Sequence, residues 1–411
     1  MSFHFELVKF PAGSYIILEG EKKFSNFYII GEGKVSIKRE FKLPSENPNE
    51  TLGPGDFFGV VSAMSRYPQI ESAIAMTRVV LLSISNNQFI QLMKKSNPAA
   101  IKMIRYFTMK LRLFGNAVEA SQGIIHDQEN TIDSKKLFKI AEAYYRNGST
   151  EASIYCYKSY MKYFPNEPKV SFIKDLLMSL GKSLDFLPQE GSMRSYRKDE
   201  MIFVEGEPGS ELFIVQKGNI KITQFANDQE IILNIMKTND IFGEMSLLDN
   251  QPRSASAVAL DDVEILAISK KSFDDMIEKQ PHIMSRIITH LSERIWNAYM
   301  LLSNTLIPDM QGRIADILLM IAIKNRVQIG PMTAFSFNES PSDLLKILGL
   351  SSKDMNAIDK YLALTSYVKL EGNRFVCTDL DLLERNVFLH REALRSRREK
   401  EEKEKAQVKI T

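Results

Sequence analysis

The feature that most constrains the fold of this 411-residue chain is an internal duplication. The segment Pro11–Ile37 aligns with Lys198–Ile222, and Leu52–Ala75 aligns with Met236–Ala259. Each copy continues into an apolar run (VVLLSI or VEILAI), a Ser-x-x-x-Phe helix start and a long helix. Matched positions lie about 185 residues apart, which is far more than the repeat length of a solenoid. The chain therefore contains two copies of one domain of roughly 110 residues.

Each copy has the pattern of a small β domain. Short runs such as LFIVQ and IKITQF alternate apolar and polar side chains, and Gly33 and Gly218 stand where tight turns must join strands. Many short antiparallel strands in a small unit indicate a jelly-roll-like β-barrel. We therefore expect an α+β multidomain protein with two such barrels, each with a long following helix.

Both of these long helices carry a heptad seam of apolar side chains. The first seam contains Ile104, Phe107, Leu111, Phe114 and Val118, and the second contains Met284, Ile288, Leu291, Ile295, Ala298 and Leu302. Such a seam suits a dimer helix, although a helix packed on its own barrel has the same stripe. We expect a homodimer formed through the helix over residues 282–304.

Between the two copies lies a segment with helical spacing. Residues 143–165 resemble a single tetratricopeptide (TPR) repeat, with the motif positions at Tyr144, Gly148, Ile154, Tyr157 and Pro165. One helical hairpin cannot form a peptide-binding groove. We therefore expect a helical, TPR-like spacer that holds the two barrels at a fixed geometry.

The overall composition excludes several classes of protein. With 53 basic and 51 acidic residues the net charge is +2, so no global field draws the chain to nucleic acid or membrane. The apolar runs are shorter than the ~18–20 residues of a membrane span, and the start has no secretory signal pattern. The two cysteines, Cys156 and Cys377, form no metal or disulfide framework and fit a reducing compartment. We expect a cytoplasmic protein that is not an enzyme, with no metal, no resident cofactor and no membrane partner.

One segment, Phe242–Ala259 with the sequence FGEMSLLDNQPRSASAVA, has the chemistry of a small-anion site. Gly243 permits close approach of the backbone, and the short helix after it can direct free N–H groups at a phosphate. Arg253 can bind two phosphate oxygens with its planar guanidinium. Ser246 and Ser254 offer hydroxyls or backbone amides nearby.

This segment resembles the cyclic-nucleotide-binding domain of catabolite-activator (CRP/FNR) regulators, protein kinase regulatory subunits and gated channels. The resemblance covers the whole second barrel and implies that Glu244 binds the ribose 2′-hydroxyl. It also implies that the purine is contacted from the following helix, where Ala298 and Tyr299 align with the contacting pair. Tyr299 can stack on or hydrogen-bond a base, and the alternative is that it belongs to the core. The expected ligand is cAMP by default, with cGMP as the alternative. The expected ligand-binding residues are Gly243, Glu244, Met245, Ser246, Arg253, Ser254 and Tyr299.

An alternative is that Glu244 and Arg253 pair only with each other. Burial of an ion pair costs desolvation without a clear gain in stability, so we favour ligand binding. The first copy lacks these anchors: it has Val60 for Glu244, Gln69 for Arg253 and Ile70 for Ser254, while Gly59 and Ser62 remain. We expect the first barrel to be structural or to bind something else, and Arg66 has the wrong spacing to replace Arg253.

The segment after residue 305 resembles the winged helix-turn-helix that follows the same barrel in catabolite-activator regulators. Ser340 is placed as a helix N-cap with Pro341 after it, Gly349 ends that helix, and Lys369–Thr378 has the pattern of a wing hairpin. The resemblance places a set of side chains toward a DNA major groove: Ser352, Lys353, Asn356, Lys360 and Arg374.

This region departs from the family in its surface chemistry. The usual Arg-Glu-x-x-x-Arg of the recognition helix is replaced by Ser352, Lys353 and Ala357, so both guanine-reading arginines are absent. Between residues 304 and 379 eight basic residues are balanced by eight acidic ones, whereas DNA-binding domains normally have a basic excess. DNA binding is still the favoured interpretation, and a winged helix retained for protein contact is the alternative.

The predicted domains follow in order: residues 1–120 a degenerate cyclic-nucleotide-binding-like domain, 121–187 the spacer, 188–305 a cyclic-nucleotide-binding domain, 306–383 the winged helix-turn-helix and 384–411 a charged tail. In the tail, Arg391, Arg395, Arg397 and Arg398 can supply phosphate contacts or form a solvated charge run. The predicted function is a cyclic-nucleotide-responsive transcription regulator in which the ligand repositions the DNA-binding domain. The alternative is a cyclic-nucleotide-responsive regulatory subunit that binds protein and not DNA.

Overall fold

The computed structural model describes residues 5–23, 25–40, 50–95, 97–121, 133–185, 189, 191–226, 229–279, 281–350 and 352–408. The described residues fall into two compact units. The first unit combines Met1–Gln91, Leu113–Gly123 and Ile288–Thr411, and the second combines Leu92–Arg112 with Ile124–Ile287. No helix in the described ranges has an apolar stretch long enough to span a bilayer.

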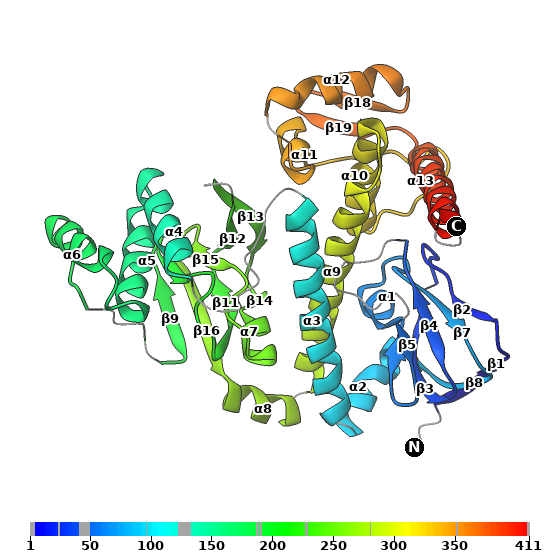
Figure 1. Ribbon diagram of the computed structural model, residues 1–411, viewed down its shortest axis with the longest axis horizontal. Coiled ribbons are helices and arrows are strands. Elements are labelled where there is room, and N and C mark those ends of the chain that lie inside the picture. Colours follow the sequence, from blue (N-terminus) through cyan, green and yellow to red (C-terminus); the bar gives the residue numbers. More distant parts are fainter. Residues whose placement is uncertain are drawn as a thin grey trace. The chain divides into compact units, whose positions relative to one another are not determined.

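The first unit contains the first barrel, which consists of two four-stranded sheets whose paired strands are all antiparallel (Figure 1). The sheet orders are β1-β8-β3-β6 and β2-β7-β4-β5. The strands are β1 (Glu6–Phe10), β2 (Tyr15–Ile17), β3 (Asn26–Glu32), β4 (Val35–Lys38), β5 (Thr51–Leu52), β6 (Phe57–Phe58), β7 (Ser72–Ala75) and β8 (Val79–Ser85). Apolar side chains of the strands, among them Ile30, Val35 and Leu81, fill the space between the sheets.

The second unit contains the second barrel, and it repeats this topology strand for strand. Its sheet orders are β14-β11-β16-β9 and β10-β15-β12-β13, again with antiparallel pairs throughout. The strands are β9 (Met193–Tyr196), β10 (Met201–Phe203), β11 (Glu211–Lys217), β12 (Ile220–Ala226), β13 (Gln229–Met236), β14 (Ile241–Phe242), β15 (Ser256–Ala259) and β16 (Val263–Ser269). Because both the order and the direction of the strands recur, the predicted duplication is confirmed.

Each barrel is accompanied by one short helix and two longer ones. In the first copy these are α1 (Val60–Ser65), α2 (Asn86–Lys95) and α3 (Asn97–Ser121), and in the second copy α7 (Glu244–Asp249), α8 (Lys270–Lys279) and α9 (Pro281–Thr305). The α3 and α9 helices begin in the second unit and end in the first. They are the long helices whose seams were predicted.

Members of the predicted α9 seam are buried within the single chain. Among them, Ile288, Leu291 and Ile295 are at most 1% exposed. On the same helix, Trp296 donates from Nε1 to the Pro68 carbonyl of the first barrel at 3.1 Å. This burial agrees with the alternative that the helix packs within its own chain, and the homodimer through residues 282–304 stays a prediction. A heptad pattern indicates that a helix is covered but does not identify what covers it.

The predicted spacer is helical. It comprises α4 (Ser134–Arg146), α5 (Thr150–Tyr163) and α6 (Lys169–Ser179), with α4 and α5 packed as a hairpin. Gly148 has a φ of +78°, and it makes the turn between these two helices. In the second unit the hairpin shares a core with the second barrel, where Tyr160 and Ile173 lie with Met201 and Val258. The part of the spacer over residues 122–132 lies outside the described residues.

The C-terminal region, in the first unit, has three helices and a small sheet. They are α10 (Met310–Lys324), α11 (Pro341–Ile347), the 3₁₀ turn η1 (Ser352–Asp354) with α12 (Met355–Leu364), and an antiparallel sheet of order β17-β19-β18. Its strands are β17 (Phe335–Ser336), β18 (Val368–Glu371) and β19 (Arg374–Cys377). The predicted N-cap is confirmed: the Ser340 hydroxyl accepts from the Asp343 N–H, and Pro341 is the first residue of α11.

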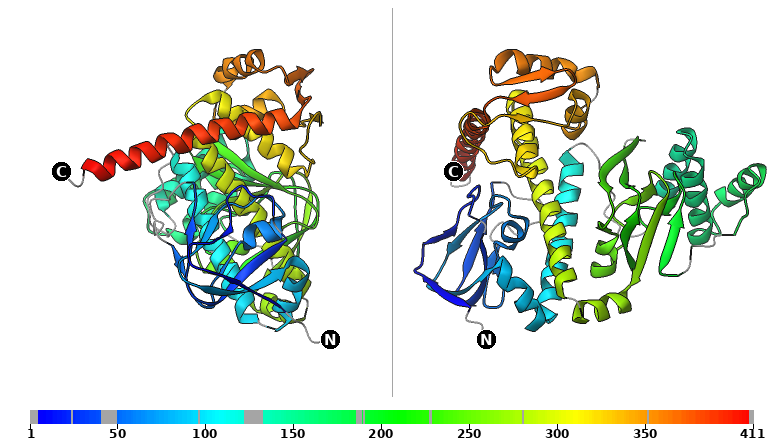
Figure 2. Two further views of the ribbon diagram at one scale, coloured as in Figure 1. Left: turned by 90° about the vertical axis from the view of Figure 1, so that its right-hand side faces the viewer. Right: turned by 180° about the vertical axis from the view of Figure 1, so that it is seen from behind.

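The charged tail is the continuation of a single helix, α13 (Leu380–Val408), which Figure 2 shows as one long rod. Arg391 of this helix is not available for a phosphate. Its Nε donates to Asp316 Oδ1 at 2.9 Å and its Nη1 to Glu40 Oε2 at 3.0 Å, and both carboxylates are about 1% exposed. Arg395 also ion-pairs with Glu40. The side chains of Arg397 and Arg398 lie outside the described residues.

Candidate functional site

The two copies hold their anion-site segments in the same backbone frame. We call Phe242–Ala259 the second cassette and its counterpart Phe58–Ala75 the first cassette. In the second, Gly206 N–H donates to the Arg253 carbonyl at 2.9 Å and Arg253 N–H donates to the Glu207 carbonyl at 2.8 Å. In the first, Gln69 takes both places of Arg253, with bonds of 2.7 and 3.0 Å to Gly20 and Glu21. The sequence alignment of Gln69 with Arg253 is therefore confirmed in space.

Arg253 lies inside the second barrel and is only 7% exposed. Its Nη1 donates to the Gly243 carbonyl at 2.6 Å and to Ser246 Oγ at 2.7 Å. The guanidinium lies over the ring of Phe203 with its central carbon 4.2 Å from the ring centroid, which is cation–π distance. Its Nε is buried and has no hydrogen-bond partner among the described residues.

Carboxylates of the described residues surround Arg253 without pairing with it: the charges of Glu207, Glu244 and Glu211 support its protonated form. Among the described residues no carboxylate forms an ion pair with it, and its two acceptors are uncharged. Burial lowers the pKa of Arg253 to about 10, and the negative charge of Glu207 opposes that shift. A buried cation without an ion-pair partner is costly, so this arrangement favours an incoming anion.

Two glycines make room for the arginine. A Cβ on Gly243, which has a φ of +72°, would lie 2.7 Å from Arg253 Nη1, and one on Gly209 would lie 2.6 Å from its Nε. At either position a side chain would therefore force Arg253 to move from its present place. The sequence analysis identified Gly243 but missed Gly209, for which the Pro208-Gly209 turn signal was the available clue.

The other predicted ligand residues of the cassette lie around Arg253. Glu244 begins α7 and is 1% exposed, and Ser246 lies on the same helix. Met245 is buried, and the Ser254 hydroxyl contacts its sulfur at 3.7 Å. The structure thus places Gly243, Ser246 and Arg253 in direct contact, with Glu244, Met245 and Ser254 next to them in the chain.

Tyr299 has a different environment from the one predicted. It is 1% exposed, its ring packs edge-on against Phe114 with centroids 5.9 Å apart, and its hydroxyl donates to Glu19 of the first barrel. Tyr299 thus lies in the core of the first unit with its hydroxyl engaged. Its predicted contact with a purine stays a prediction.

Sequence reasoning also missed the side chains that support Arg253. The Glu207 carboxylate accepts from Tyr155 Oη at 3.0 Å, from Ser159 Oγ at 2.9 Å and from Val204 N–H at 2.9 Å. Burial raises the pKa of Glu207, while these donors and Arg253 oppose the shift. Tyr155 and Ser159 belong to α5, so the spacer helps to position the second cassette. Because Tyr155 and Ser159 are far from Glu207 in the sequence, no local sequence pattern could have predicted these contacts.

The first cassette contains its own carboxylate. Glu71, two residues after Gln69, accepts from Gly59 N–H at 3.3 Å and from Arg39 Nη2 at 2.8 Å. Gly59 is the counterpart of Gly243, so Glu71 occupies a backbone donor that an anion would need. Gln69 itself is 3% exposed and donates to the Lys23 carbonyl at 2.9 Å. These contacts agree with a first barrel that lacks an ordinary cyclic-nucleotide site.

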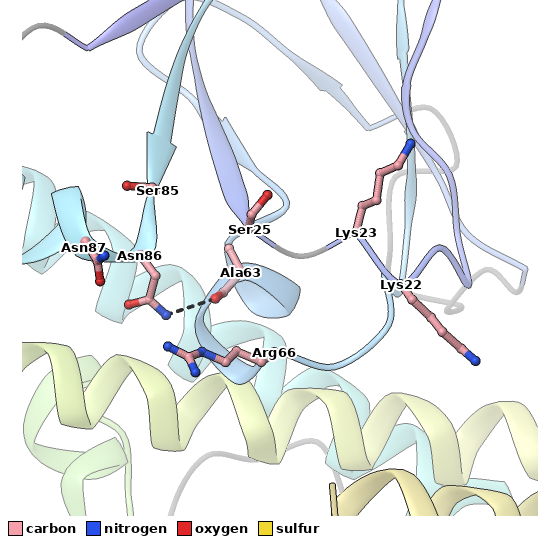
Figure 3. A pocket seen from close by; sticks show the side chains of 8 residues that line it. All are labelled: Lys22, Lys23, Ser25, Ala63, Arg66, Ser85, Asn86 and Asn87. Atoms are coloured by element: carbon pink, nitrogen blue, oxygen red, sulfur yellow. Dashed lines mark hydrogen bonds between the residues drawn. The ribbon is translucent and has the colours of Figure 1, made fainter. Parts of the chain in front are cut away.

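A cavity of about 480 Å³ lies beside the first barrel rather than at Arg253 (Figure 3). Two of its cations are engaged, because Lys22 ion-pairs with Glu384 at 2.7 Å and Lys23 with Glu21 at 2.9 Å. The exposed side chain of Arg66 lies in this cavity and therefore does not replace Arg253. The lining residues are Lys22, Lys23, Ser25, Ala63, Arg66, Ser85, Asn86 and Asn87.

The predicted DNA-facing side chains lie on the surface of the C-terminal region. Lys353, Asn356 and Lys360 are exposed on η1 and α12, and Arg374 is exposed at the start of β19. The exposed Asp359 lies among them. The side chain of Ser352 lies outside the described residues. Among the described residues no cluster of His, Cys, Asp or Glu could hold a metal ion.

Comparison with known proteins agrees with this geometry. The "CRP-like cAMP-activated global transcriptional regulator" of Mycobacterium tuberculosis is 28% identical over 193 residues, which are 47% of this chain and 86% of that protein. The "Cyclic AMP receptor protein" of Thermus thermophilus is 29% identical over 196 residues, 47% of this chain and 88% of that protein. Human "cGMP-dependent protein kinase 2" is 24% identical over 271 residues, 65% of this chain and 27% of that protein.

Residues 7–96 and 193–280 each match the family described as "Cyclic nucleotide-binding domain". These two ranges contain most of the first barrel with its cassette and most of the second barrel with Arg253. Both barrels are therefore cyclic nucleotide-binding domains by family, and only the second retains the buried arginine.

Proposed function

We propose that the chain is a cyclic-nucleotide-responsive transcription regulator whose ligand, cAMP by default, binds at Arg253 of the second barrel. The observation that carries this proposal is the buried guanidinium with an unpartnered Nε and no ion-pair partner among the described residues. A cyclic phosphate supplies the missing negative charge and can accept two or more of the guanidinium hydrogen bonds.

The present contacts of Arg253 indicate how binding occurs. Its Nη1 donates to the Gly243 carbonyl and to Ser246 Oγ, which are neutral acceptors within the cassette. The phosphate oxygens take the place of these acceptors, and the hydroxyls of Ser246 and Ser254 then become available to the ligand. Glu244, at the start of α7, serves as acceptor for the ribose 2′-hydroxyl. Ligand binding therefore rearranges the cassette around a fixed barrel.

The output in this proposal is DNA binding by a winged helix-turn-helix made of α10, α11, α12 and the β17-β19-β18 sheet. Lys353, Asn356 and Lys360 form one exposed surface, to which the hairpin adds Arg374. These side chains contact phosphates and base edges in a major groove. Because guanine-reading arginines are absent, specificity depends mainly on Asn356, which suits adenine.

The test combines a titration with a DNA selection. Purified full-length chain is titrated calorimetrically with cAMP and cGMP, and one nucleotide per chain is expected. Random-sequence DNA is then selected on the protein with and without the nucleotide that binds. Enrichment that depends on the nucleotide, and that Lys353→Ala and Lys360→Ala reduce, supports the proposal. Lys346→Ala, on the exposed surface of α11, is the matched control.

A second candidate function is a cyclic-nucleotide-responsive regulatory subunit that binds protein instead of DNA. It is favoured by the balance of eight basic and eight acidic residues between 304 and 379, and by Asp359 among the exposed lysines of α12. A nucleotide-dependent protein partner together with no DNA enrichment identifies this function. Absence of nucleotide binding by the wild type overturns both candidates.

A further inference from the structure

The loop that carries Arg253 is held from outside the second barrel by Arg112 of α3, and Lys270 of α8 adds a hydrogen bond to Asn250 Oδ1 at 3.1 Å. Arg112 Nε donates to Asp249 Oδ2 at 2.5 Å, and its Nη2 donates to Asp249 Oδ1 at 3.2 Å and to the Pro252 carbonyl at 2.9 Å. Asp249 is the last residue of α7, and Pro252 directly precedes Arg253. One planar guanidinium therefore ties both ends of the loop between α7 and Arg253.

The environment of this contact makes it more than a surface ion pair. The side chains of Arg112 and Asp249 are 22% and 14% exposed, so solvent screens them incompletely. Asp249 Oδ1 also accepts from Gln251 N–H at 3.0 Å, which fixes the start of the same loop. All these residues lie within the second unit.

The same carbonyl position is held in the first barrel by an unrelated side chain. Pro68 directly precedes Gln69 as Pro252 precedes Arg253, and the Pro68 carbonyl accepts from Trp296 Nε1 of α9 at 3.1 Å. Thus the helix that follows the second barrel holds the first cassette, and the helix that follows the first barrel holds the second cassette. Two different donors at one matched carbonyl indicate that this is where a cassette is coupled to a helix.

Arg112 lies within α3, so a displacement of the Arg253 loop can act on this helix. The α3 helix is uninterrupted from Asn97 to Ser121, with Arg112 at the end of its second-unit part and Phe114 in the first unit. There Phe114 packs on Tyr299, whose hydroxyl donates to Glu19. Because α3 continues past Arg112 to Ser121, a shift of the loop at Arg253 can act on this helix.

We propose that Arg112 is a positioning residue of the nucleotide site, which holds the Arg253 loop and couples its occupancy to α3. This inference rests on the proposed function, because it concerns regulation of the same site. If a nucleotide phosphate draws Arg253 away from Gly243 and Ser246, the strain is transmitted through Pro252 and Asp249 to Arg112. The signal then leaves the second barrel through α3.

The experiment is a double-mutant cycle on the full-length chain. Wild type, Arg112→Gln, Asp249→Asn and the double variant are titrated with cAMP and with cGMP. Each single variant is expected to lose roughly tenfold in affinity, and the double variant no more than a single one, since the two residues act through one contact. Lys182→Gln breaks the exposed Lys182–Glu151 ion pair of the same unit and serves as control, with no expected change.

A second readout separates positioning from simple structural support. Amide hydrogen exchange over residues 113–121 is expected to change on nucleotide binding in the wild type and in Arg112→Lys, which keeps the charge. At saturating nucleotide it is expected not to change in Arg112→Gln. If Arg112→Gln binds nucleotide and transmits the change like the wild type, this inference is wrong and the proposed function stands. If the wild type binds no cyclic nucleotide, the proposed function is wrong and this inference falls with it.

Discussion

Arg253 and Gln69 occupy matched positions of the two barrels and have the same backbone hydrogen bonds, but the Arg253 side chain is charged and the Gln69 side chain is neutral. Arg253 is a buried cation whose acceptors are a carbonyl and a hydroxyl. Gln69 is a neutral side chain, and close to it the Glu71 carboxylate already binds Gly59 N–H and Arg39. In the first cassette the Glu71 carboxylate accepts from the N–H of the matched glycine, Gly59, whereas the carboxylate of the second cassette, Glu244, is the first residue of α7.

We expect from this difference that the first barrel does not bind a cyclic nucleotide, although it has the same fold as the second. The strand order, the αL glycine before the short helix and the loop register are shared by both copies. In the first copy the Glu71 carboxylate accepts from Gly59 N–H, a donor that a bound anion would otherwise use. The shared backbone therefore reflects the common origin of the two barrels, while we expect two or three side chains to determine what each barrel binds.

The largest effect is expected at the arginine itself. Arg253→Ala removes the charged donor for the phosphate, which costs about 2–5 kcal/mol, or at least tenfold in affinity at ~1.4 kcal/mol per decade. Gln69→Ala is expected to leave nucleotide affinity unchanged. Calorimetric titration of wild type and both variants measures this. Two equal sites in the wild type, or equal losses in both variants, would contradict the comparison.

A second prediction contrasts two buried arginines by their stability. Arg391→Ala removes the cation that pairs with both Asp316 and Glu40, and although Glu40 keeps its ion pair with Arg395, the buried Asp316 loses this cation, so the change is expected to cost about 3–5 kcal/mol of unfolding free energy. Arg253→Ala removes a cation that has no carboxylate partner among the described residues. In the absence of nucleotide it is expected to change the unfolding free energy by less than about 1 kcal/mol.

Thermal unfolding of the nucleotide-free variants provides the measurement. A large drop in Tm for Arg391→Ala beside a small change for Arg253→Ala supports the assignment of Arg253 as a residue kept for binding. If Arg253→Ala is the more destabilised of the two variants, Arg253 has a structural role, and the hypothesis that it distinguishes a binding cassette from a non-binding one is wrong.

The sequence predicted those features that depend on residues close together in the chain. These are the alternating strands, the Gly-Glu pair at the start of α7 and the Ser340 cap, and the structure contains all of them. Contacts between distant residues were not predictable. Arg112 and Asp249 are 137 positions apart, and nothing in either neighbourhood indicates the other.

The surroundings of Tyr299 and of the α9 seam could not be predicted from the sequence for a related reason. An apolar stripe reports that a helix face is buried, and it carries no information on whether a second chain, the preceding barrel or another barrel buries it. Here the side chains of α9 meet the first barrel through Trp296 and Tyr299. The family resemblance placed Tyr299 at the ligand, whereas in this chain its ring packs against Phe114 and its hydroxyl donates to Glu19 of the first barrel.

A third prediction concerns the substitutions that would create a nucleotide site in the first barrel. Gln69→Arg alone is expected to leave one nucleotide per chain, because the new guanidinium would meet the carboxylate of Glu71. The triple variant Val60→Glu, Gln69→Arg, Glu71→Ala supplies both anchors and frees Gly59 N–H. It is expected to add a second, weaker site. The stoichiometry of the titration distinguishes these outcomes, and a second site in Gln69→Arg alone would show that Glu71 does not block the cassette.

The smallest effect concerns another matched pair, Glu19 and Glu205, whose N–H groups both donate to a serine hydroxyl at 2.9 Å. Glu205 ion-pairs with Lys136 at 2.6 Å, whereas Glu19 lies near Tyr299 and Glu40. Burial raises the pKa of Glu19 to about 7, and the charge of Glu40 adds to the shift. Between about pH 4.5 and 7 the folded chain therefore holds a proton that the unfolded chain releases.

Stability from this group is consequently present at low pH and is lost as the pH rises toward 7, by at most about 1.4 kcal/mol per pH unit. Glu19→Gln keeps an acceptor for the Tyr299 hydroxyl but cannot titrate. The difference in unfolding free energy between wild type and Glu19→Gln is therefore expected to shift in favour of the variant between pH 5 and pH 7.5. Denaturant titrations at the two pH values measure it. A constant difference would mean that Glu19 does not titrate between these two pH values in the folded chain.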